Sequence, residues 1–176
     1  MTMIDEKNDV LRFGYGETKV GLVLVAVSGR GVAAILLGSD RARLRRDLGG
    51  SFQGVSFVED QAGLAETIGK VVALVDEPGG ELDLALDLRG SELELAVWQA
   101  LRTIPAGETR SYGALAKGLP MPAMAQEVGA ACAANRLAVA IPCHRVVKAD
   151  GSISGYRWGV DRKRRLLSME SVGLWR

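Results

Sequence analysis

Cysteine and histidine are scarce in this chain of 176 residues, which has two cysteines, Cys132 and Cys143, and one histidine, His144. Two cysteines make a poor disulfide framework for a chain of this length, so we expect both to be free thiols in a reducing compartment. The sequence has no CxxC motif, and one histidine with two cysteines leaves too few ligands for a tetrahedral zinc site. We therefore expect neither a disulfide nor a structural metal.

Long apolar runs and targeting signals are absent as well. No stretch reaches the length that spans a bilayer, and the N-terminal segment MTMIDEKNDV is polar and acidic, unlike a secretion signal. Hydrophobic residues make up 48% of the chain and charged residues 24%, which is enough to bury a core. We expect a cytoplasmic protein with no membrane partner, folded as one large domain or two small ones.

The net charge of +1 conceals an uneven distribution along the chain. Residues 1–96 hold 10 basic and 16 acidic side chains, residues 97–135 hold 3 and 2, and residues 136–176 hold 9 and 3. The basic C-terminal third is typical of a protein with an anionic partner such as nucleic acid. On charge alone, a solvated basic helix at DRKRRLL explains the pattern as well.

The first half of the chain mixes strand and helix patterns. Apolar runs on both sides of SGRG predict a strand–turn–strand hairpin over residues 20–38. ELDLALDL alternates leucines with mostly acidic residues, which predicts a half-buried strand at residues 81–88. Three further elements are predicted: a basic helix at 40–48, a strand at 54–60 and a helix at 61–75. Together they indicate a small α/β unit that ends near Leu88.

Helical patterns dominate the second half. The predicted helices are 92–104 with Ser91 as its cap, 111–118 with Ser111 at its start, 121–135 with Pro122 in its first turn, and a final helix at 160–171. The second and third of these, joined by GLPMP, resemble a helix-turn-helix. The third is rich in alanine and glycine, which would allow close approach to another surface. From the residues alone, packing within the protein's own core is the better interpretation of those small residues.

The octapeptide AIPCHRVV places Cys143 directly before the only histidine. A cysteine is nucleophilic as its thiolate, so it needs a base or a positive charge nearby. Adjacent side chains on an extended segment point to opposite sides, so the sequence does not guarantee a direct contact between Cys143 and His144. A bridging water would solve the geometry, and Glu170 is a candidate carboxylate that orients the imidazole. A lone Cys–His pair is more often structural, because free cysteine is among the most buried residue types.

Longer segments around this pair carry a more specific pattern. In NRLAVAIPCHRVV an asparagine stands eight residues before the cysteine, and GSISGYRWGVDRKRRLLSMES follows downstream. With VWQALRTIPAGETRSYGALA, GVAAILLG and LDLALDLRGS, these segments resemble the O6-alkylguanine-DNA alkyltransferases, above all the methyltransferase domain of bacterial Ada-type proteins. The resemblance covers nearly the whole chain.

This resemblance implies an α/β fold with two parts. Residues 1–88 would form a ribonuclease H-like α/β subdomain, and residues 89–176 a catalytic and DNA-binding subdomain with a winged-helix-like helix-turn-helix. The implied activity is DNA repair by a monomer without cofactor or metal. The protein would transfer the alkyl group irreversibly from O6-methylguanine in double-stranded DNA to Cys143, after rotating the base out through the minor groove. Activity on O4-methylthymine stays open.

The resemblance also implies a role for each catalytic position. Cys143 would accept the alkyl group and keep it. His144 would deprotonate Cys143 through a water, and Glu170 would orient His144. Asn135 would hold the turn between the recognition helix and the active-site loop.

The positions implied to line the base pocket are Tyr112, Cys132, Val146, Tyr156 and Arg157. Tyr112 would help to rotate the nucleotide and donate toward the guanine. The carbonyls of Val146 and of the nucleophile would accept from the exocyclic amine. Tyr156 and Arg157 would belong to a loop that closes over the base, and Cys132 would have no nucleophilic role.

The implied DNA-binding positions are Ser111, Ala125, Gln126 and Ala133. Small residues would let the recognition helix enter the minor groove, which replaces the core-packing interpretation. This chain departs from the family at Gln126, where an arginine usually fills the space left by the rotated base, and at Glu127, where a small residue is usual. Losing a cation and gaining an anion beside phosphates should weaken DNA binding and slow duplex repair.

Three classes of function follow. The first is a single-use repair transferase, and the second is a relative that binds alkylated bases but transfers poorly, which the altered residue at 126 favours. The presence of Cys143 favours the first, because the non-reactive branch of the family replaces this cysteine. A Cys–His hydrolase would need an oxyanion hole that the sequence does not offer. The chain lacks the zinc-binding cysteines and activator module of full Ada-type proteins, so a stand-alone protein and part of a longer chain both stay open.

Overall fold

A computed structural model describes residues 9–174 of the chain, and the side chains of residues 9–171. The polar segment at residues 1–8 and the outer ends of the two predicted subdomain ranges therefore lie outside the described residues. The boundary near Leu88 stays a prediction.

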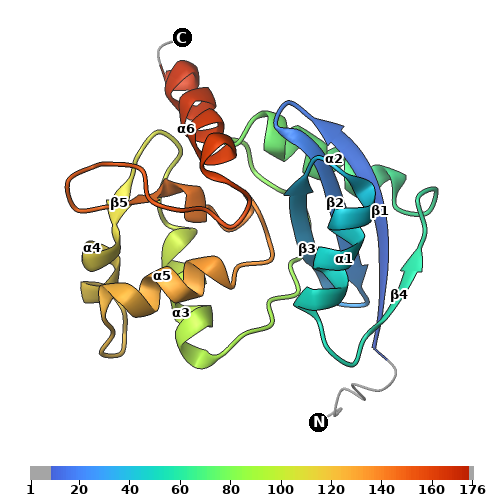
Figure 1. The fold of residues 1–176 in the computed structure, drawn as a ribbon, viewed down its shortest axis with the longest axis horizontal. Coiled ribbons are helices and arrows are strands. Elements are labelled where there is room, and N and C mark those ends of the chain that lie inside the picture. Colours follow the sequence, from blue (N-terminus) through green and yellow to red (C-terminus); the bar gives the residue numbers. More distant parts are fainter. Residues whose placement is uncertain (1–8, 175–176) are drawn as a thin grey trace.

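A mixed four-stranded sheet occupies the first part of the chain (Figure 1). Its strands are β1 (Val10–Thr18), β2 (Gly21–Ser28), β3 (Gly31–Gly38) and β4 (Ser56–Glu59). The order across the sheet is β3-β2-β1-β4; the first three strands are antiparallel, and β4 runs parallel to β1. The predicted hairpin at 20–38 and the strand at 54–60 are confirmed.

Two helices, α1 (Arg41–Ser51) and α2 (Ala65–Asp76), cover opposite faces of this sheet. On one face, Arg45 of α1 lies 5.3 Å from the ring centre of Phe13 in β1. On the other face, α2 packs so closely that a Cβ on Gly14 would stand 2.7 Å from the side chain of Ile68. Strand residues alternate between the two faces of a sheet, so Phe13 contacts α1 and Gly14 lies against α2. Both helices agree with the sequence prediction.

The sequence interpretation assigned no strand to β1. Leu11, Phe13 and Tyr15 are buried in the alternating pattern of a strand, but Gly14 and Gly16 interrupt it. Glycine weakens a strand signal because it adds backbone entropy and no side chain to pack. Here the glycines make room for α2, so a packing requirement hides the strand from the sequence pattern.

The strand predicted at 81–88 is wrong. The alternating exposure is present, but only Leu86 forms a bridge, to Val32 of β3. Further along the same edge of β3, Ile35 donates its N–H to the carbonyl of Arg136 at 2.8 Å and accepts from Ala138 at 3.0 Å. The segment that leads to the active site thus occupies the rest of this edge, so a second full strand cannot pair there.

The second part of the chain is mainly helical. Its elements are α3 (Glu92–Leu101), β5 (Arg110–Ser111), α4 (Tyr112–Lys117), α5 (Ala125–Ala133), the short 3₁₀ turn η2 (Cys143–Arg145), β6 (Val146–Val147) and α6 (Val160–Leu174). Ser91 caps α3 and Ser111 caps α4, as predicted, with hydroxyl oxygens that accept backbone N–H groups at 3.1 Å. The helix predicted at 121–135 begins only at Ala125, so Pro122 lies outside it, and α3 ends three residues early.

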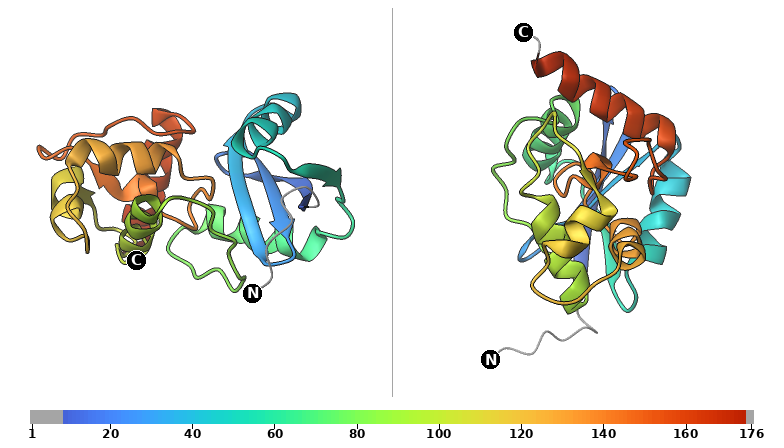
Figure 2. Two further views of the ribbon diagram at one scale, coloured as in Figure 1. Left: turned by 90° about the horizontal axis from the view of Figure 1, so that it is seen from below. Right: turned by 90° about the vertical axis from the view of Figure 1, so that its left-hand side faces the viewer.

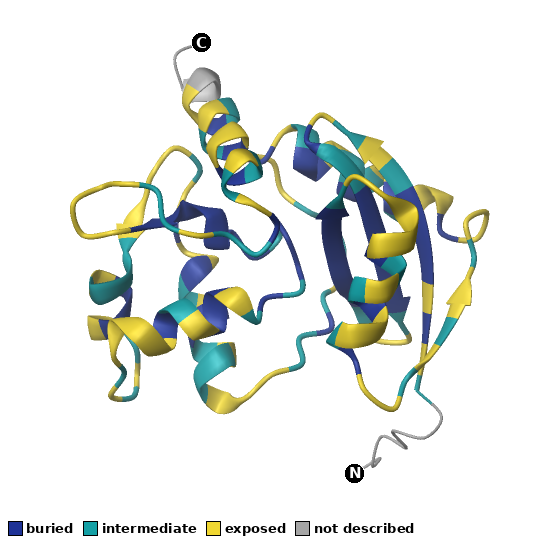
Figure 3. Cartoon of the chain, in the orientation of Figure 1, coloured by how far each residue is buried: buried dark blue, intermediate teal, exposed yellow. Residues whose placement is uncertain are grey.

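The two parts lie side by side, and the β3 edge faces the active-site turn (Figures 1 and 2). In Figure 3, strands β2 and β3 and the turn η2 are mostly dark blue, the colour of buried residues. None of the described helices is both long and apolar enough to cross a lipid bilayer.

Candidate active site

A pocket of about 350 Å³ opens beside η2 and contains the candidate nucleophile. It is lined by residues from α4, α5, η2 and the loop before α6: Tyr112, Gly129, Cys132, Ala133, Cys143, Gly155, Tyr156 and Arg157. The structure thus brings together four of the five residues predicted to line a base pocket. The fifth, Val146, is fully buried in β6, beside β5 and the pocket wall.

Asn135 forms hydrogen bonds that fix the position of Cys143. Its side-chain N–H groups donate to the Ile141 carbonyl at 3.0 Å and to the Cys143 Sγ at 3.3 Å, and its Oδ1 accepts from the Leu137 N–H at 2.9 Å. Asn135 itself is completely buried. One amide side chain therefore fixes both the turn after α5 and the position of the thiol.

Burial raises the pKa of the Cys143 thiol to about 11, and the Asn135 hydrogen bond and the charge of Lys163 offset this only in part. Burial also raises the pKa of Cys132, to about 12. At neutral pH both groups are thiols. Because the thiolate is the nucleophile, Cys143 needs a base that removes its proton as it reacts.

His144 and Glu170 supply an arrangement suited to that task. His144 Nε2 lies 2.7 Å from Glu170 Oε1, and both side chains are buried. Burial alone would raise the pKa of the Glu170 carboxyl, but hydrogen bonds from His144 and Arg145 outweigh it and lower that pKa, so the group is ionised and can only accept. Nε2 therefore carries the proton. Nδ1 is buried without a hydrogen-bond partner among the described residues and is left with its lone pair free.

The expected extended backbone at Cys143 and His144 is not present. Both residues lie in the 3₁₀ turn η2, which follows Pro142 and is closed by a bond from the Arg145 N–H to the Pro142 carbonyl at 3.0 Å. The turn places His144 against α6, away from the pocket, whereas Cys143 lines the pocket. No hydrogen bond joins the Cys143 and His144 side chains among the described residues, so the bridging water stays a prediction.

Sequence reasoning missed two charged residues behind the pocket. Arg145 donates to Glu170, and Lys163 is fully buried with its Nζ 2.9 Å from Ser154 Oγ. Ser154 in turn forms a hydrogen bond with the Tyr112 hydroxyl. Helical spacing is the signal that could have found Lys163, because Lys163, Leu166 and Glu170 share one face of α6 and are all buried.

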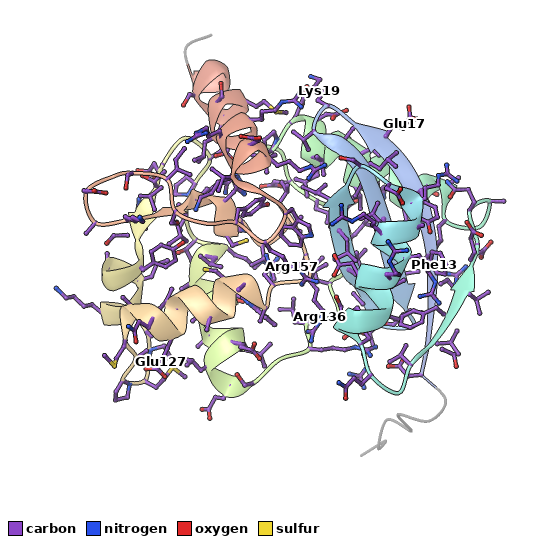
Figure 4. All side chains as sticks on the ribbon, viewed as in Figure 1. Phe13, Glu17, Lys19, Glu127, Arg136 and Arg157 are labelled. Atoms are coloured by element: carbon purple, nitrogen blue, oxygen red, sulfur yellow. The ribbon has the colours of Figure 1, made fainter. Side chains whose placement is uncertain are left out.

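Arg157 lines the pocket but directs its guanidinium to the sheet side. It donates to the Asn135 carbonyl at 2.7 Å and to Asp47 and Ser51 of α1 at 2.9 and 2.7 Å. Arg136 similarly donates to the Ser51 carbonyl at 2.8 Å. Figure 4 shows both arginines between α5 and α1. The loop around Arg157 is therefore tied to the first part of the chain, in addition to covering the pocket.

Tyr156 lies on the pocket wall and packs edge-on against Trp158, with ring centres 5.3 Å apart. Its hydroxyl is buried and has no partner among the described residues. A buried hydroxyl without a partner is costly, and this one belongs to a residue that lines the pocket.

The small residues of α5 divide between two surfaces. Ala131 and Cys132 are buried against α3 and α4, whereas Ala125 and Ala133 are exposed. Gln126 is exposed in the first turn, beside Glu127. The Glu127 carboxylate accepts from the Met124 N–H at 3.0 Å, so the residue that departs from the family pattern caps its own helix.

No group of three or more metal-ligating side chains occurs in the part of the chain that the structure describes. The expectation that the protein needs no metal or cofactor stays a prediction.

Known proteins are similar to this chain in sequence and in fold. The family model described as "6-O-methylguanine DNA methyltransferase, DNA binding domain" matches residues 92–172. The bifunctional transcriptional activator/DNA repair enzyme Ada of Escherichia coli is 44% identical over 165 residues, which cover 94% of this chain and 47% of Ada. The methylated-DNA–protein-cysteine methyltransferase of Mycobacterium leprae is 41% identical over 116 residues, covering 66% of this chain and 70% of that protein.

Among solved structures, Mycobacterium tuberculosis OGT in complex with DNA is similar over 93% of both chains, with a TM-score of 0.74 and 31% identity. The chain spans about half the length of several curated relatives that it matches, Ada included. Because the chain matches 70% of the M. leprae protein and 93% of the OGT chain, it belongs to the family of methylated-DNA–protein-cysteine methyltransferases.

Proposed function

We propose that this protein repairs alkylated DNA by transferring the methyl group of O6-methylguanine to Cys143. The observation that carries the proposal is a buried thiol at the floor of an open pocket, one residue from a histidine whose free nitrogen is a base. Relatives named as methylated-DNA–protein-cysteine methyltransferases support the reaction type, and a relative solved in complex with DNA supports the substrate.

The proposed reaction is a single displacement. The Cys143 sulfur attacks the methyl carbon, the carbon–oxygen bond breaks, and its electron pair stays on O6 of the guanine. The thiol proton passes through a water to His144 Nδ1, while Nε2–H keeps its bond to Glu170. The product at Cys143 is a thioether, whose carbon–sulfur bond water does not cleave at neutral pH. Each protein molecule therefore transfers one methyl group.

The pocket wall supports recognition of a rotated base. The pocket volume of about 350 Å³ falls in the usual range for small-ligand pockets, about 300–1,000 Å³. Tyr112 would donate toward the guanine and Tyr156 would cover it, while the carbonyls of Cys143 and Val146 would accept from its amine. A base inside a duplex cannot reach such a pocket, so the nucleotide must leave the stack.

The exposed side of α5 would bind DNA from the minor groove. Ala125 and Ala133 present only methyl groups there, and Gln126 would stand where the base leaves the stack. Ser111, the cap of α4, would contact the backbone. In the same proposal the protein is a monomer, with a ribonuclease H-like subdomain predicted over residues 1–88. The catalytic and DNA-binding subdomain, with its winged-helix-like helix-turn-helix, is predicted over residues 89–176. O4-methylthymine is a further candidate substrate.

The test is the intact mass of the protein after incubation with an oligonucleotide that carries O6-methylguanine. We expect one added methyl group, located on Cys143 by peptide mapping, for wild type and for Cys132→Ser. Cys143→Ser should gain none while it still binds the oligonucleotide. Wild-type protein that binds without gaining mass would instead belong to the lesion-binding class.

Gln126 is the observation that favours that second class. Replacing it, in Gln126→Arg, should speed methyl transfer in duplex DNA and steepen the dependence of log K on log salt concentration by about 0.9, as one added phosphate contact does. Transfer from the single-stranded oligonucleotide should change little. The matched control is Gln126→Leu, which adds no charge. An equal duplex rate for Gln126→Arg and wild type would show that the missing arginine does not limit repair.

A further inference from the structure

Arg145 makes four hydrogen bonds beside the active site. Its Nη1 donates to the Ile104 carbonyl at 2.7 Å, and its Nη2 donates to the Pro78 carbonyl at 2.8 Å. Its Nε and Nη2 also lie 2.9 and 2.7 Å from Glu170 Oε1. Arg145 is only 7% exposed, so these contacts form away from solvent.

The oxygen that Arg145 binds is the one that His144 uses. Glu170 Oε1 accepts from His144 and from two nitrogens of Arg145, whereas Oε2 has only a distant contact, 3.5 Å from the Gly107 N–H. We propose that Arg145 is a positioning residue that keeps His144 neutral, with its Nδ1 lone pair available, by sharing the Glu170 carboxylate oxygen with it. This inference rests on the proposed transfer to Cys143.

The physical reason is charge balance inside the protein. A buried carboxylate with only a histidine beside it favours the protonated imidazolium, because the two opposite charges attract. Arg145 is permanently charged and already neutralises Glu170. Adding a proton to His144 would then leave a net positive charge in a buried site, which is costly.

The other groups around His144 act consistently with this account. Burial lowers the pKa of His144, the charges of Arg145 and of Lys163 on α6 lower it further, and Glu170 opposes them. Cys143 is a neutral thiol over the relevant pH range. The buried face of α3, which also packs on η2, is apolar: Val97, Trp98 and Leu101.

The chain offers a direct readout, because His144 is its only histidine. In untagged protein, the imidazole C2–H signal in an NMR titration therefore reports this residue alone. Wild type should titrate with a midpoint below the ordinary value of 6.5. In Arg145→Met and Arg145→Gln the midpoint should rise by about one pH unit, as expected when a nearby like charge is removed. The pH below which the methyl-transfer rate falls should rise by the same amount.

Two variants separate charge from structure. Arg145→Lys keeps the charge with fewer hydrogen bonds and should keep the wild-type midpoint. Arg136→Met also loses bonds to backbone carbonyls, those of Ser51 and Arg89, without touching Glu170, and should leave the midpoint unchanged. A purely structural role of Arg145 would lower the rate equally at every pH.

An unmoved midpoint in folded Arg145→Met or Arg145→Gln would overturn the inference. If neither variant folds, the wild-type titration still tests the inference, because a midpoint at or above 6.5 contradicts it. The titration needs no DNA. A protein that shows the shift but transfers no methyl group contradicts only the proposed function, and one that transfers without the shift contradicts only the role of Arg145.

Discussion

Val139, four residues before the nucleophile, has an unusual backbone conformation. Its φ is +69°, and the Ala140 N–H donates to the Ala138 carbonyl at 2.8 Å, which closes a three-residue turn around it. A β-branched residue with positive φ is a true outlier, and such strain costs roughly 1–3 kcal/mol. The packed surroundings hold it, because Val139 is buried.

This strain predicts an inverted order of stability between two substitutions. At most buried sites glycine is worse than alanine by about 0.5–1 kcal/mol. At position 139 glycine adopts positive φ freely, so Val139→Gly should have a higher free energy of unfolding than Val139→Ala. Urea denaturation of both variants measures this. Val128, buried in the regular helix α5, is the matched control, where alanine should remain better than glycine. The usual order at both sites would mean that the turn stores no strain.

At the scale of a single element, α5 shows how one carboxylate can serve stability while it opposes binding. Glu127 accepts from the Met124 N–H and so satisfies one of the donors left free at a helix N-terminus. A carboxylate there is also favoured by the helix dipole. The same negative charge stands on the side of the helix proposed to approach phosphates.

Two substitutions of Glu127 should separate these effects. Glu127→Gln keeps an acceptor oxygen for Met124 and removes the charge, so duplex affinity should rise with little loss of stability. Glu127→Ala also removes the acceptor and should lower the free energy of unfolding by about 0.5–2 kcal/mol, the usual value of a cap. Thermal unfolding and DNA titration of both variants provide the measurements. Equal stability of the two variants would show that the cap contributes nothing.

Elements whose signals are local could be predicted from the sequence. The hairpin at 20–38, the helix capped by Ser91 and the cap at Ser111 follow from neighbouring residues alone, and the structure confirms them. The false strand at 81–88 and the missed β1 depend on partners far along the chain. In the first case the edge of β3 is occupied by residues near 137, and in the second α2 requires glycine.

The candidate site divides in the same way. Cys143, His144, Asn135 and Tyr112 were placed by family motifs, and the structure brings them to one pocket or its support. Lys163 escaped notice because it belongs to a run of charges that reads as a solvated surface. Its spacing from Leu166 and Glu170 indicates a shared helix face, but its partner Ser154 lies in a loop that this spacing does not predict.

At the scale of the whole molecule, buried ionisable groups make stability depend on pH. His144 has a pKa below its ordinary value of 6.5 in the folded protein. The unfolded chain therefore takes up a proton below pH 6.5 while the folded protein resists it, and stability present above that pH is lost as the pH falls. Glu170 and Asp87, whose pKa values are also lowered, add to the loss at more acidic pH.

Replacing the histidine should remove the first part of this acid sensitivity. Between pH 6.5 and 5, the free energy of unfolding of wild type should fall relative to His144→Gln, by at most about 1.4 kcal/mol per pH unit for one proton. Glutamine can still donate to Glu170, so the comparison keeps that contact. Urea denaturation across the pH range measures the difference. Parallel curves for the two proteins would mean that His144 titrates equally in both states.

The shared edge of β3 has a consequence for synthesis on the ribosome. Ile35 pairs with Leu137, which is added to the nascent chain 102 residues later. At about 5–20 residues per second, this edge waits roughly 5–20 seconds for its partner. During that interval an apolar strand stays open to other chains, so newly made protein should depend on chaperones more than the finished fold suggests.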